Sequence, residues 1–389
     1  MRKKRIDVAL IARPDHSYYI YEKLLKSNLK FVYITFKLCP QWLGRLFRVT
    51  RLRWAKGSCR QSFLMTLHNI GAYNYNIKWV SRINGGRIFD NYIRRKLAHM
   101  QIRLIHYWPD YCINTIEEYK KRNDGVKTIA DIYMPSCKYI INEVGGILKE
   151  YNIQGNLDIF ERGIRTEERI MSKEREFFVP STFVANTYSR FYEDKVFHVV
   201  SYGIEKWKDY RKKKVPIKIN RFVYVGTISV EKGCDFLCEW FLKHPEYEIH
   251  LIGKIHYNEG FVFEKYKNER NIIFEGLIPK NEIRPFVSQF DIGLHLSRFD
   301  AYSLAVSEVI SAGLPVIVST TTGNCSDVLE YGLGKVVELN DGSLDIAVKE
   351  VIEKYQTFID QIDNHMNGSD YNYAQEIVKR YEEILGNNS

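Results

Sequence analysis

The sequence predicts an α/β protein built from two doubly wound parallel sheets, and three observations lead to this prediction. The chain has 389 residues, which is too long for one ordinary hydrophobic core and favours two domains. Hydrophobic residues make up 45% of the chain, as is typical of a fully folded globular protein. Short apolar runs alternate with helix-length segments in both halves, and this alternation is typical of parallel sheets covered by helices.

The expected elements fall into two runs. In the first run, strands are predicted at 6–12, 31–36, 103–107, 127–132, 177–179 and 196–200. The helices of this run are expected near 16–26, 90–99, 115–121, 139–150, 165–175 and 182–191, and residues 37–89 carry no clear pattern. In the second run, strands are predicted at 222–225, 248–252, 271–274, 292–295, 316–318 and 335–338, with closing helices near 345–355 and 374–385.

A charged segment separates the two runs. Residues 206–218 are rich in lysine and contain Pro216, so we expect a basic, solvated linker there. The predicted domains are 1–205 and 219–370, followed by a C-terminal helix in 371–389 that could cross back to the N-terminal domain. Sheets of this kind bind ligands at the carboxyl ends of their strands, which would face each other across a central cleft.

Composition excludes several classes. No stretch approaches the roughly 18 uncharged apolar residues that a membrane span needs, and the first apolar run is too short for a signal peptide. The seven cysteines are scattered and odd in number, which favours core thiols in a reducing cytoplasm. Their spacing shows no second pair that could complete a metal site with Cys234 and Cys238.

Positive charge is concentrated in one segment. The formal net charge is +10, and residues 23–89 contain thirteen Lys or Arg but no Asp or Glu. Because Trp42, Phe47 and Trp54 lie between the basic residues, the segment suits the anionic headgroups of a membrane surface. The same pattern would suit nucleic acid, but no nucleic-acid-binding module is recognisable. A solvated basic face without a partner is the third interpretation.

Two carboxylates mark the most informative stretch, Asp300 to Glu308. Glu308 is surrounded by apolar residues of a predicted helix, and a buried carboxylate needs hydrogen-bond donors. Eight helical residues span about 12 Å, which is close to the sugar-to-ribose distance in a nucleotide-diphosphate sugar. The helix would begin near Ser303, where free N–H groups can hold a phosphate. The alternative is that Glu308 only pairs with a neighbouring lysine.

A glycine-bounded turn from Gly226 to Gly233 follows the first strand of the second run. It ends in Lys232 and Gly233 at the start of a helix. Backbone N–H groups and one ammonium group could therefore meet a phosphate there. An ordinary surface lysine near a helix start would give the same local sequence.

Together these motifs resemble those of family 4 glycosyltransferases, which have the GT-B fold. The matching stretches are Val225–Gly233, Phe274–Pro279, Asp300 with Glu308, Gly313–Val316 and Thr322–Asn324. The resemblance covers about residues 175–340, and the first 170 residues share only the architecture. It implies two Rossmann-like domains, an acceptor-binding N-terminal domain and a nucleotide-sugar-binding C-terminal domain.

The resemblance also implies roles for single residues. Lys232 would contact the donor diphosphate, Asp300 the hydroxyls of the transferred sugar, and Glu308 those of the ribose, and these three form the expected catalytic set. The full expected donor-binding set is Gly226, Thr227, Lys232, Gly276, Leu277, Ile278, Asp300, Tyr302, Ser303, Leu304 and Glu308. Within it, the backbone of 302–304 would cradle phosphate and the turn at 276–278 would flank the base.

The chain departs from the family in four places. Thr227 replaces an arginine, and Lys254 or Arg298 could supply the missing cation. Asp300 replaces a glutamate. The glycine-rich acceptor loop is absent at 13–18, and Ala130 stands where the family has a histidine. The acceptor-side candidates are therefore Asp15, His16, His106 and Asp131, although a lone histidine at a strand end, such as His106, is more often structural.

The expected function is that of a retaining glycosyltransferase. It would use a UDP- or GDP-sugar, without a metal or other cofactor, because no Asp-x-Asp motif is present. The acceptor would be an oligosaccharide or a lipid-linked saccharide of cell-surface polysaccharide assembly, such as lipopolysaccharide or capsule. The basic segment 23–89 would place the enzyme in the cytoplasm, at the inner face of the membrane, and no nucleic acid is expected as a partner. The alternatives are a catalytically inactive nucleotide-sugar-binding protein or a nucleic-acid-binding protein.

Overall fold

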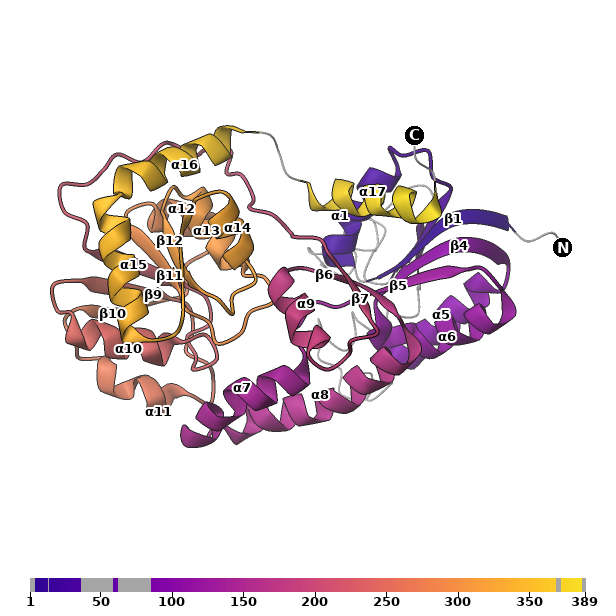
Figure 1. Cartoon of the computed structure of the whole chain (residues 1–389), viewed down its shortest axis with the longest axis horizontal. Helices are drawn as coiled ribbons and strands as arrows, with labels where there is room; N and C mark the ends of the chain where they lie inside the picture. Colours follow the sequence, from indigo (N-terminus) through magenta and orange to yellow (C-terminus); the bar gives the residue numbers. More distant parts are fainter. Residues whose placement is uncertain (1–3, 13, 36–58, 62–84, 369–371, 387–389) are drawn as a thin grey trace, which may run out of the picture.

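Two parallel sheets, each covered by helices, form the protein (Figure 1). The computed structural model describes residues 4–12, 14–35, 59–61, 85–368 and 372–386. The side chains of residues 14–16, 18, 59–61, 111 and 154–156 are not described. The predicted α/β class, with two doubly wound parallel sheets, is confirmed.

The N-terminal sheet has seven strands in the order β3-β2-β1-β4-β5-β6-β7. Their bounds are Lys4–Ile11 (β1), Phe31–Thr35 (β2), Cys59–Gln61 (β3), Met100–Tyr107 (β4), Lys127–Asp131 (β5), Glu176–Val179 (β6) and Val196–Val199 (β7). The central strand β1 is buried on both faces, as expected for a strand between two helix layers. It runs from the N-terminus toward the other domain, so the carboxyl edge of this sheet faces that domain.

The C-terminal sheet has six parallel strands in the order β10-β9-β8-β11-β12-β13. Their bounds are Arg221–Val225 (β8), Glu248–Ile252 (β9), Ile272–Gly276 (β10), Ile292–His295 (β11), Val316–Ser319 (β12) and Gly334–Val337 (β13). The strand order reverses between β8 and β11. Ligands of doubly wound folds bind at this point, outside the carboxyl ends of the strands.

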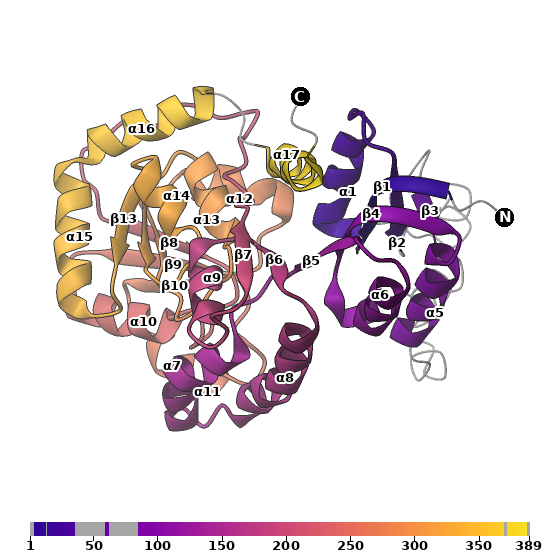
Figure 2. The same ribbon diagram turned by 45° about the vertical axis from the view of Figure 1, so that its right-hand side comes forward.

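Helices cover both sheets (Figure 2). Those of the N-terminal domain are Pro14–Leu24 (α1), Gly85–Leu97 (α5), Pro109–Arg122 (α6), Cys137–Glu150 (α7), Gln154–Lys173 (α8) and Thr182–Ser189 (α9). Those that follow are Cys234–Lys243 (α10), Gly260–Phe263 (α11), Lys280–Val287 (α12), Leu304–Ser311 (α13), Cys325–Glu330 (α14), Asp341–Glu353 (α15), Tyr355–Asn367 (α16) and Tyr373–Leu385 (α17), with a 3-10 turn at Glu264–Tyr266. In the described part of the chain, no helix combines the length and the hydrophobicity needed to span a bilayer.

Several elements differ from the sequence prediction. Strand β3 lies in the stretch that carried no pattern. Helix α8 begins eleven residues earlier than expected (154 rather than 165), because Gly163 interrupts the apolar pattern. A Cβ at Gly163 would lie 2.5 Å from Sγ of Cys137, so this glycine lets α7 and α8 pack closely. Helix α16 was not predicted, although Tyr355, Phe358, Ile359, Ile362 and Met366 are buried at helical spacing.

The linker is less solvated than expected. Lys213 is partly buried, and its ammonium group donates to the carbonyl groups of Ser288 and Phe290. Lys212 pairs with Asp360 at 2.7 Å. The linker therefore follows the surface of the C-terminal domain over part of its length instead of extending into solvent.

After α16 the chain returns to the N-terminal domain, where α17 packs beside α1 (Figure 1). Arg103 donates to the carbonyl group of Leu385, and the hydroxyl of Tyr381 lies 2.5 Å from Nδ1 of His106. Helix α17 thus completes the covering of β1 and β4, although it follows the C-terminal domain in the sequence.

The described thiols lie inside the protein. Cys112, Cys137, Cys234 and Cys238 are buried and Cys325 is half-buried, and all five are free. Burial raises the pKa of Cys137 to about 11. These thiols are therefore protonated at neutral pH and contribute to packing as small apolar side chains.

Candidate functional site

The turn after β8 is held in shape by two glycines. Gly226 has φ of 145° and Gly233 has φ of 70°, both in the region that favours glycine. A Cβ at Gly233 would lie 1.9 Å from the carbonyl oxygen of Leu296, and a Cβ at Gly253 would lie 1.8 Å from that of Gly226. The turn therefore packs directly on the backbone of the neighbouring strand ends, and this packing positions Lys232 at the start of α10.

Asp300 follows β11 and receives three contacts. Its Oδ2 atom lies 2.7 Å from Nζ of Lys232 and accepts a hydrogen bond from Nε2 of His295 at 3.3 Å. Its Oδ1 atom accepts the N–H of Tyr302 at 3.2 Å. The imidazole of His295 is buried and stacks on the ring of Tyr224, with centroids 5.5 Å apart and planes at 10°. Asp300 and Lys232 thus come together from two neighbouring strands.

The charges of this cluster are coupled. Burial alone would raise the pKa of Asp300, but the hydrogen bond from His295 and the charge of Lys232 outweigh it, so the pKa lies below its usual range. Burial lowers the pKa of His295, against the opposite effect of Asp300. At neutral pH the site therefore holds an ionised Asp300 and a neutral His295.

Glu308 lies on α13 and is half-buried. Among the residues that the structure describes, no hydrogen bond or ion pair engages its carboxylate. Burial raises its pKa, while the charges of Lys280 and Arg284 act in the opposite direction. The alternative that Glu308 pairs directly with a lysine is not what the structure shows, and its oxygens are available to a ligand.

The first turn of α13 is built on a rigid loop. The Ser303 hydroxyl caps the helix by accepting the N–H of Val306, and the N–H of Ser303 donates to Oδ1 of Asn324 at 2.6 Å. The N–H groups of the first helical residues, Leu304 and Ala305, have no partner within the helix. The Leu304 side chain is 53% exposed, so this helix end is open to a ligand.

Two further loops border this edge of the sheet. Gly276 has φ of 73° and its carbonyl oxygen accepts the N–H of Gly253 at 2.7 Å, while Leu277 is exposed and Ile278 is half-buried. The turn at 276–278 therefore follows β10, beside the loop that follows β9. The donor-binding candidates thus come from loops at the carboxyl ends of β8, β10 and β11.

The missing arginine has one free candidate substitute. Arg298 is engaged by a bidentate pair with Asp235, at 2.6 and 2.8 Å, and is not available. Lys254 is exposed, and none of the described residues forms a hydrogen bond or ion pair with its side chain. The N–H of Ile228 donates to the Lys254 carbonyl, so Lys254 lies beside the exposed Thr227.

The acceptor-side candidates are separated by the structure. Asp15 and His16 lie in α1, but their side chains are not among those described. His106 is fully buried, with its Nδ1 at 2.5 Å from Tyr381 and its Nε2 at 3.0 Å from Oδ2 of Asp131. Asp131 ends β5 and is 15% exposed. His106 therefore contacts Asp131 from the interior of the protein, and only Asp131 of this pair is accessible to solvent.

Contacts between the domains join the two carboxyl edges. The Ser181 hydroxyl donates to the carbonyl of Ala301 at 2.8 Å, and Phe160 packs edge-to-face on Phe299 at 5.6 Å. The Tyr302 hydroxyl lies 2.5 Å from Oδ2 of Asp327. The loop that carries Asp300 is thus braced by both domains.

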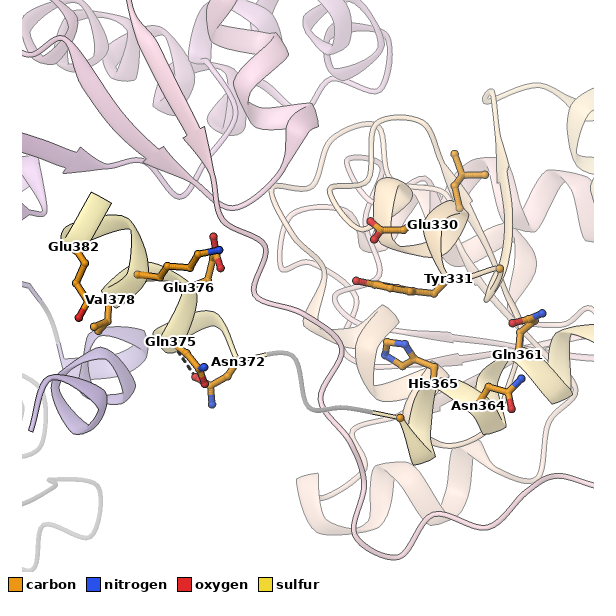
Figure 3. A pocket seen from close by; sticks show the side chains of 14 residues that line it. Glu330, Tyr331, Gln361, Asn364, His365, Asn372, Gln375, Glu376, Val378 and Glu382 are labelled. Carbon is orange, nitrogen blue, oxygen red and sulfur yellow. Dashed lines mark hydrogen bonds between the residues drawn. The ribbon is translucent and has the colours of Figure 1, made fainter. Parts of the chain in front are cut away.

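A separate cavity of about 1070 Å³ lies between the α14–α16 side of the C-terminal domain and α17 (Figure 3). Its lining includes Tyr331, His365, Asn372 and Glu376, and no candidate donor residue takes part. Burial and the charge of Lys206 lower the pKa of His365. The cavity is not assigned as the donor site, because the candidate donor-binding residues lie elsewhere.

One prediction falls largely outside the described residues. Most of the basic segment 23–89 belongs to the stretches 36–58 and 62–84, which the structure does not describe. In the described ranges, no group of three or more His, Cys, Asp or Glu is arranged to hold a metal ion.

His295 was not among the predicted site residues. In the apolar strand β11 it reads as one more buried position, and its hydrogen bond to Asp300 becomes visible only when the loop after β11 is folded. The sequence did contain one signal that could have identified it: His295 is a titratable residue five positions before the candidate carboxylate Asp300.

Residues 205–362 match the family described as Glycosyl transferases group 1. The chain is 29% identical to the sulfoquinovosyl transferase SQD2 of Arabidopsis thaliana over 130 residues, which are 33% of this chain and 25% of that enzyme. The aligned part therefore spans about a quarter of that relative.

Solved structures share the fold over nearly the whole chain. The sucrose-phosphate synthase of Thermosynechococcus elongatus superposes with a TM-score of 0.63 at 14% identity, covering 99% of this chain and all (100%) of that one. The lipopolysaccharide outer core galactosyltransferase WaaB superposes with a TM-score of 0.61 at 14% identity, covering 98% and 100%. At this level of identity, the likeness extends to the fold alone.

Proposed function

We propose that this chain, whose residues 205–362 match the group 1 glycosyltransferase family, moves a sugar from a nucleotide-diphosphate sugar to a saccharide acceptor with retention of configuration. One observation carries the proposal: Lys232 and His295 converge on the carboxylate of Asp300, directly before the open first turn of α13. A cation, a fixed carboxylate and free N–H groups in one place suit a phosphate beside a hydroxylated ring.

Donor binding would use each part of the cluster. In the donor-free chain, Lys232 neutralises Asp300, and a diphosphate would attract the ammonium group toward its own charge. Asp300 remains held by His295 and by the N–H of Tyr302, so it can accept hydrogen bonds from sugar hydroxyls. Glu308, one turn into α13, would accept those of the ribose, and the loop 276–278 would flank the base.

Leaving-group departure creates negative charge on the diphosphate. Lys232 and the first N–H groups of α13 would stabilise this charge without a metal ion. In our proposal, the acceptor hydroxyl attacks on the face from which the diphosphate leaves. The departing phosphate oxygen takes the hydroxyl proton as the new glycosidic bond forms. Unchanged turnover after chelation with EDTA would support the metal-independent form of this step, and loss of activity restored by Mg²⁺ would contradict it.

The acceptor would be held by the N-terminal domain. We propose an oligosaccharide or lipid-linked saccharide of cell-surface polysaccharide assembly, supported by the similarity to a lipopolysaccharide galactosyltransferase and by the basic composition of 23–89. The protein would then act in the cytoplasm at the inner face of the membrane. Co-sedimentation with anionic liposomes tests this, and binding that is absent at low salt or unchanged at high salt argues against an electrostatic surface.

A thermal-shift screen with UDP-, GDP- and ADP-sugars tests the donor site. A ligand that binds only the native state raises the melting temperature according to its affinity. We expect one nucleotide-sugar class to stabilise the wild-type protein, and Glu308→Gln to reduce that shift. The absence of any shift with all three classes would refute the donor assignment.

A nucleotide-sugar-binding protein without transferase activity is the second candidate. Thr227 and Ala130 favour it, since both replace residues that the family uses. Donor binding without sugar transfer to any member of an acceptor mixture would establish this alternative. The nucleic-acid-binding alternative requires salt-dependent retention on DNA or RNA.

A further inference from the structure

Two aromatic residues stand side by side at the carboxyl edge of the N-terminal sheet. Trp108 follows β4 directly and Tyr133 follows β5 by two residues. Because β4 and β5 are adjacent and parallel, their carboxyl ends lie together. The ring centroids are 5.5 Å apart, with 33° between the planes. The Tyr133 side chain is 45% exposed, so this aromatic surface reaches solvent.

Hydrogen bonds fix both rings. Nε1 of Trp108 donates to Oδ2 of Asp131 at 2.6 Å, and the hydroxyl of Tyr133 donates to Oδ2 of Asp110 at 2.6 Å. Trp108 also occupies the position directly before α6, and its backbone N–H donates to the carbonyl of Ile11. The rings are therefore preorganised, which lowers the entropy cost of binding a ligand against them.

Asp131 is oriented from behind by a chain of buried groups. Its Oδ2 atom is occupied by Trp108 and by Nε2 of His106, at 2.6 and 3.0 Å. His106 is in turn held by the Tyr381 hydroxyl of α17 at 2.5 Å. These contacts fix Oδ2 of the partially exposed Asp131 carboxylate. The other oxygen, Oδ1, can accept a hydrogen bond from a ligand at the edge of the aromatic pair.

The group lies next to the donor site. Strand β6 pairs with β5, and Asp131 lies opposite Phe178. Ser181, two residues after β6, donates to the carbonyl of Ala301, the residue after Asp300. A ligand on Trp108 and Tyr133 would therefore lie at the sheet edge that contacts the loop carrying Asp300, the carboxylate assigned to the transferred sugar.

We propose that Trp108, Tyr133 and Asp131 form a subsite for a neutral sugar ring of the acceptor. The aromatic faces would contact the C–H groups of the sugar, and Oδ1 of Asp131 would accept from a hydroxyl at its edge. Asp110 and Asp131 would repel an acidic or phosphorylated group at this position. This inference rests on the proposed transferase function and specifies the kind of residue that accepts the sugar.

Saturation-transfer NMR with the methyl glycosides of glucose, galactose, mannose and N-acetylglucosamine tests the subsite on the full chain. At least one glycoside should bind the wild-type protein. Removing the exposed aromatic face in Tyr133→Ala should weaken that binding about tenfold. Tyr133→Phe keeps the ring and should bind nearly as the wild type does. Tyr331→Ala, which removes a tyrosine that packs on His365 in the other domain, is the matched control.

A second variant distinguishes a loss of glycoside binding from a loss of folding. Trp108→Phe keeps an aromatic face but loses the N–H that fixes Asp131, and it should bind the glycoside more weakly than the wild type. Binding unchanged in both Tyr133→Ala and Trp108→Phe would overturn the subsite, as would the absence of binding of all four glycosides. Melting curves with UDP- and GDP-sugars separate the two proposals. If no donor binds, the transferase function fails, and the glycoside result still decides the subsite.

Discussion

The ammonium nitrogen of Lys232 lies 2.7 Å from Oδ2 of Asp300, the oxygen that also accepts a hydrogen bond from the buried imidazole of His295. A single carboxylate oxygen thus holds the cation of the glycine turn and the ring of the adjacent strand. In the donor-free chain, this contact keeps Lys232 oriented and prevents two unpaired charges. It also makes the three residues interdependent, so their substitutions should have unequal effects on turnover and stability.

Lys232→Ala should lower turnover much more than stability. Removal of a donor that stabilises developing charge costs about 10²–10³-fold in kcat in other enzymes. Asp300 keeps its contacts with His295 and with the N–H of Tyr302 in this variant, so the protein should still fold, with a melting temperature lowered by the loss of an ion pair to a largely buried carboxylate. Initial rates and melting curves measure both effects. Lys243→Ala, which breaks an exposed pair with Asp341, is the control, and full activity in Lys232→Ala would disprove the assignment.

Glu308→Gln should weaken donor binding without loss of stability. Burial raises the pKa of Glu308, so the ionised carboxylate is disfavoured in the folded state at neutral pH. The neutral amide removes this cost, and the melting temperature should stay equal or increase. The donor KM should rise about tenfold, as expected for the loss of a charge-assisted hydrogen bond. A lower melting temperature with unchanged KM would show a structural role instead.

His295→Gln should flatten the acid side of the stability profile. Burial lowers the pKa of His295, so below pH 6.5 the unfolded chain gains a proton that the folded chain resists, and stability falls as pH falls. The lowered pKa of Asp300 acts only below its unfolded value of 3.8, outside this window. Urea unfolding at pH 7.5 and 5.5 should show a smaller difference in the variant than in the wild type.

His365→Gln is the matched control for that experiment. Its pKa is also lowered by burial, so its substitution should flatten the same part of the profile. It lies away from Asp300, and donor affinity should change only in His295→Gln. Equal donor affinity in the two variants would contradict a positioning role of His295.

Gly233→Ala should destabilise the C-terminal domain and disturb the site. The added Cβ would meet the Leu296 carbonyl oxygen at 1.9 Å and force a φ of 70° on an alanine, a strain of roughly 1–3 kcal/mol or more. Gly146→Ala, at an exposed helical position of α7 with open space around it, should stabilise by about 0.5–1 kcal/mol. Denaturant unfolding of both variants tests the contrast, and equal stabilities would refute it.

Lys254→Ala should raise the donor KM about tenfold if Lys254 supplies the phosphate charge that Thr227 lacks. An arginine introduced beside it, in the double variant Lys254→Ala and Thr227→Arg, should restore donor affinity through a bidentate contact. Lys349→Ala on α15 is the control for a lost surface charge. The donor KM of the wild type and of the three variants tests this role. An unchanged KM in Lys254→Ala would show that Lys232 is the lysine that supplies the phosphate contact.

The features that depend only on residues close together in the sequence could be predicted from the sequence. The strand runs, the glycine turn and the positions of Lys232 and Asp300 after two strands could all be identified from short stretches. That their side chains meet depends on β11 lying beside β8, and no local pattern specifies this pairing. His295 precedes Asp300 by only five residues, but a histidine in an apolar strand pattern reads as a buried position, and its hydrogen bond to Asp300 depends on the fold of the loop between them.

The acceptor side depends even more on distant segments. His106 is separated by 275 residues from the Tyr381 hydroxyl that holds its ring. The sequence therefore presented His106 as a free candidate, whereas folding places it inside the protein. Trp108 and Tyr133 gave no signal because single aromatic residues after strands are common, and only the sheet brings them together.

Helix α17 has a consequence for biosynthesis. It follows the whole C-terminal domain, yet its Tyr381 holds the ring of His106, which contacts Asp131 in the domain that is translated first. A nascent chain released before α17 would therefore leave β1 and β4 partly uncovered and His106 without its tyrosine. Such a chain would expose apolar surface, which marks it for proteolysis. The N-terminal domain thus stays incomplete until α17 has been synthesised.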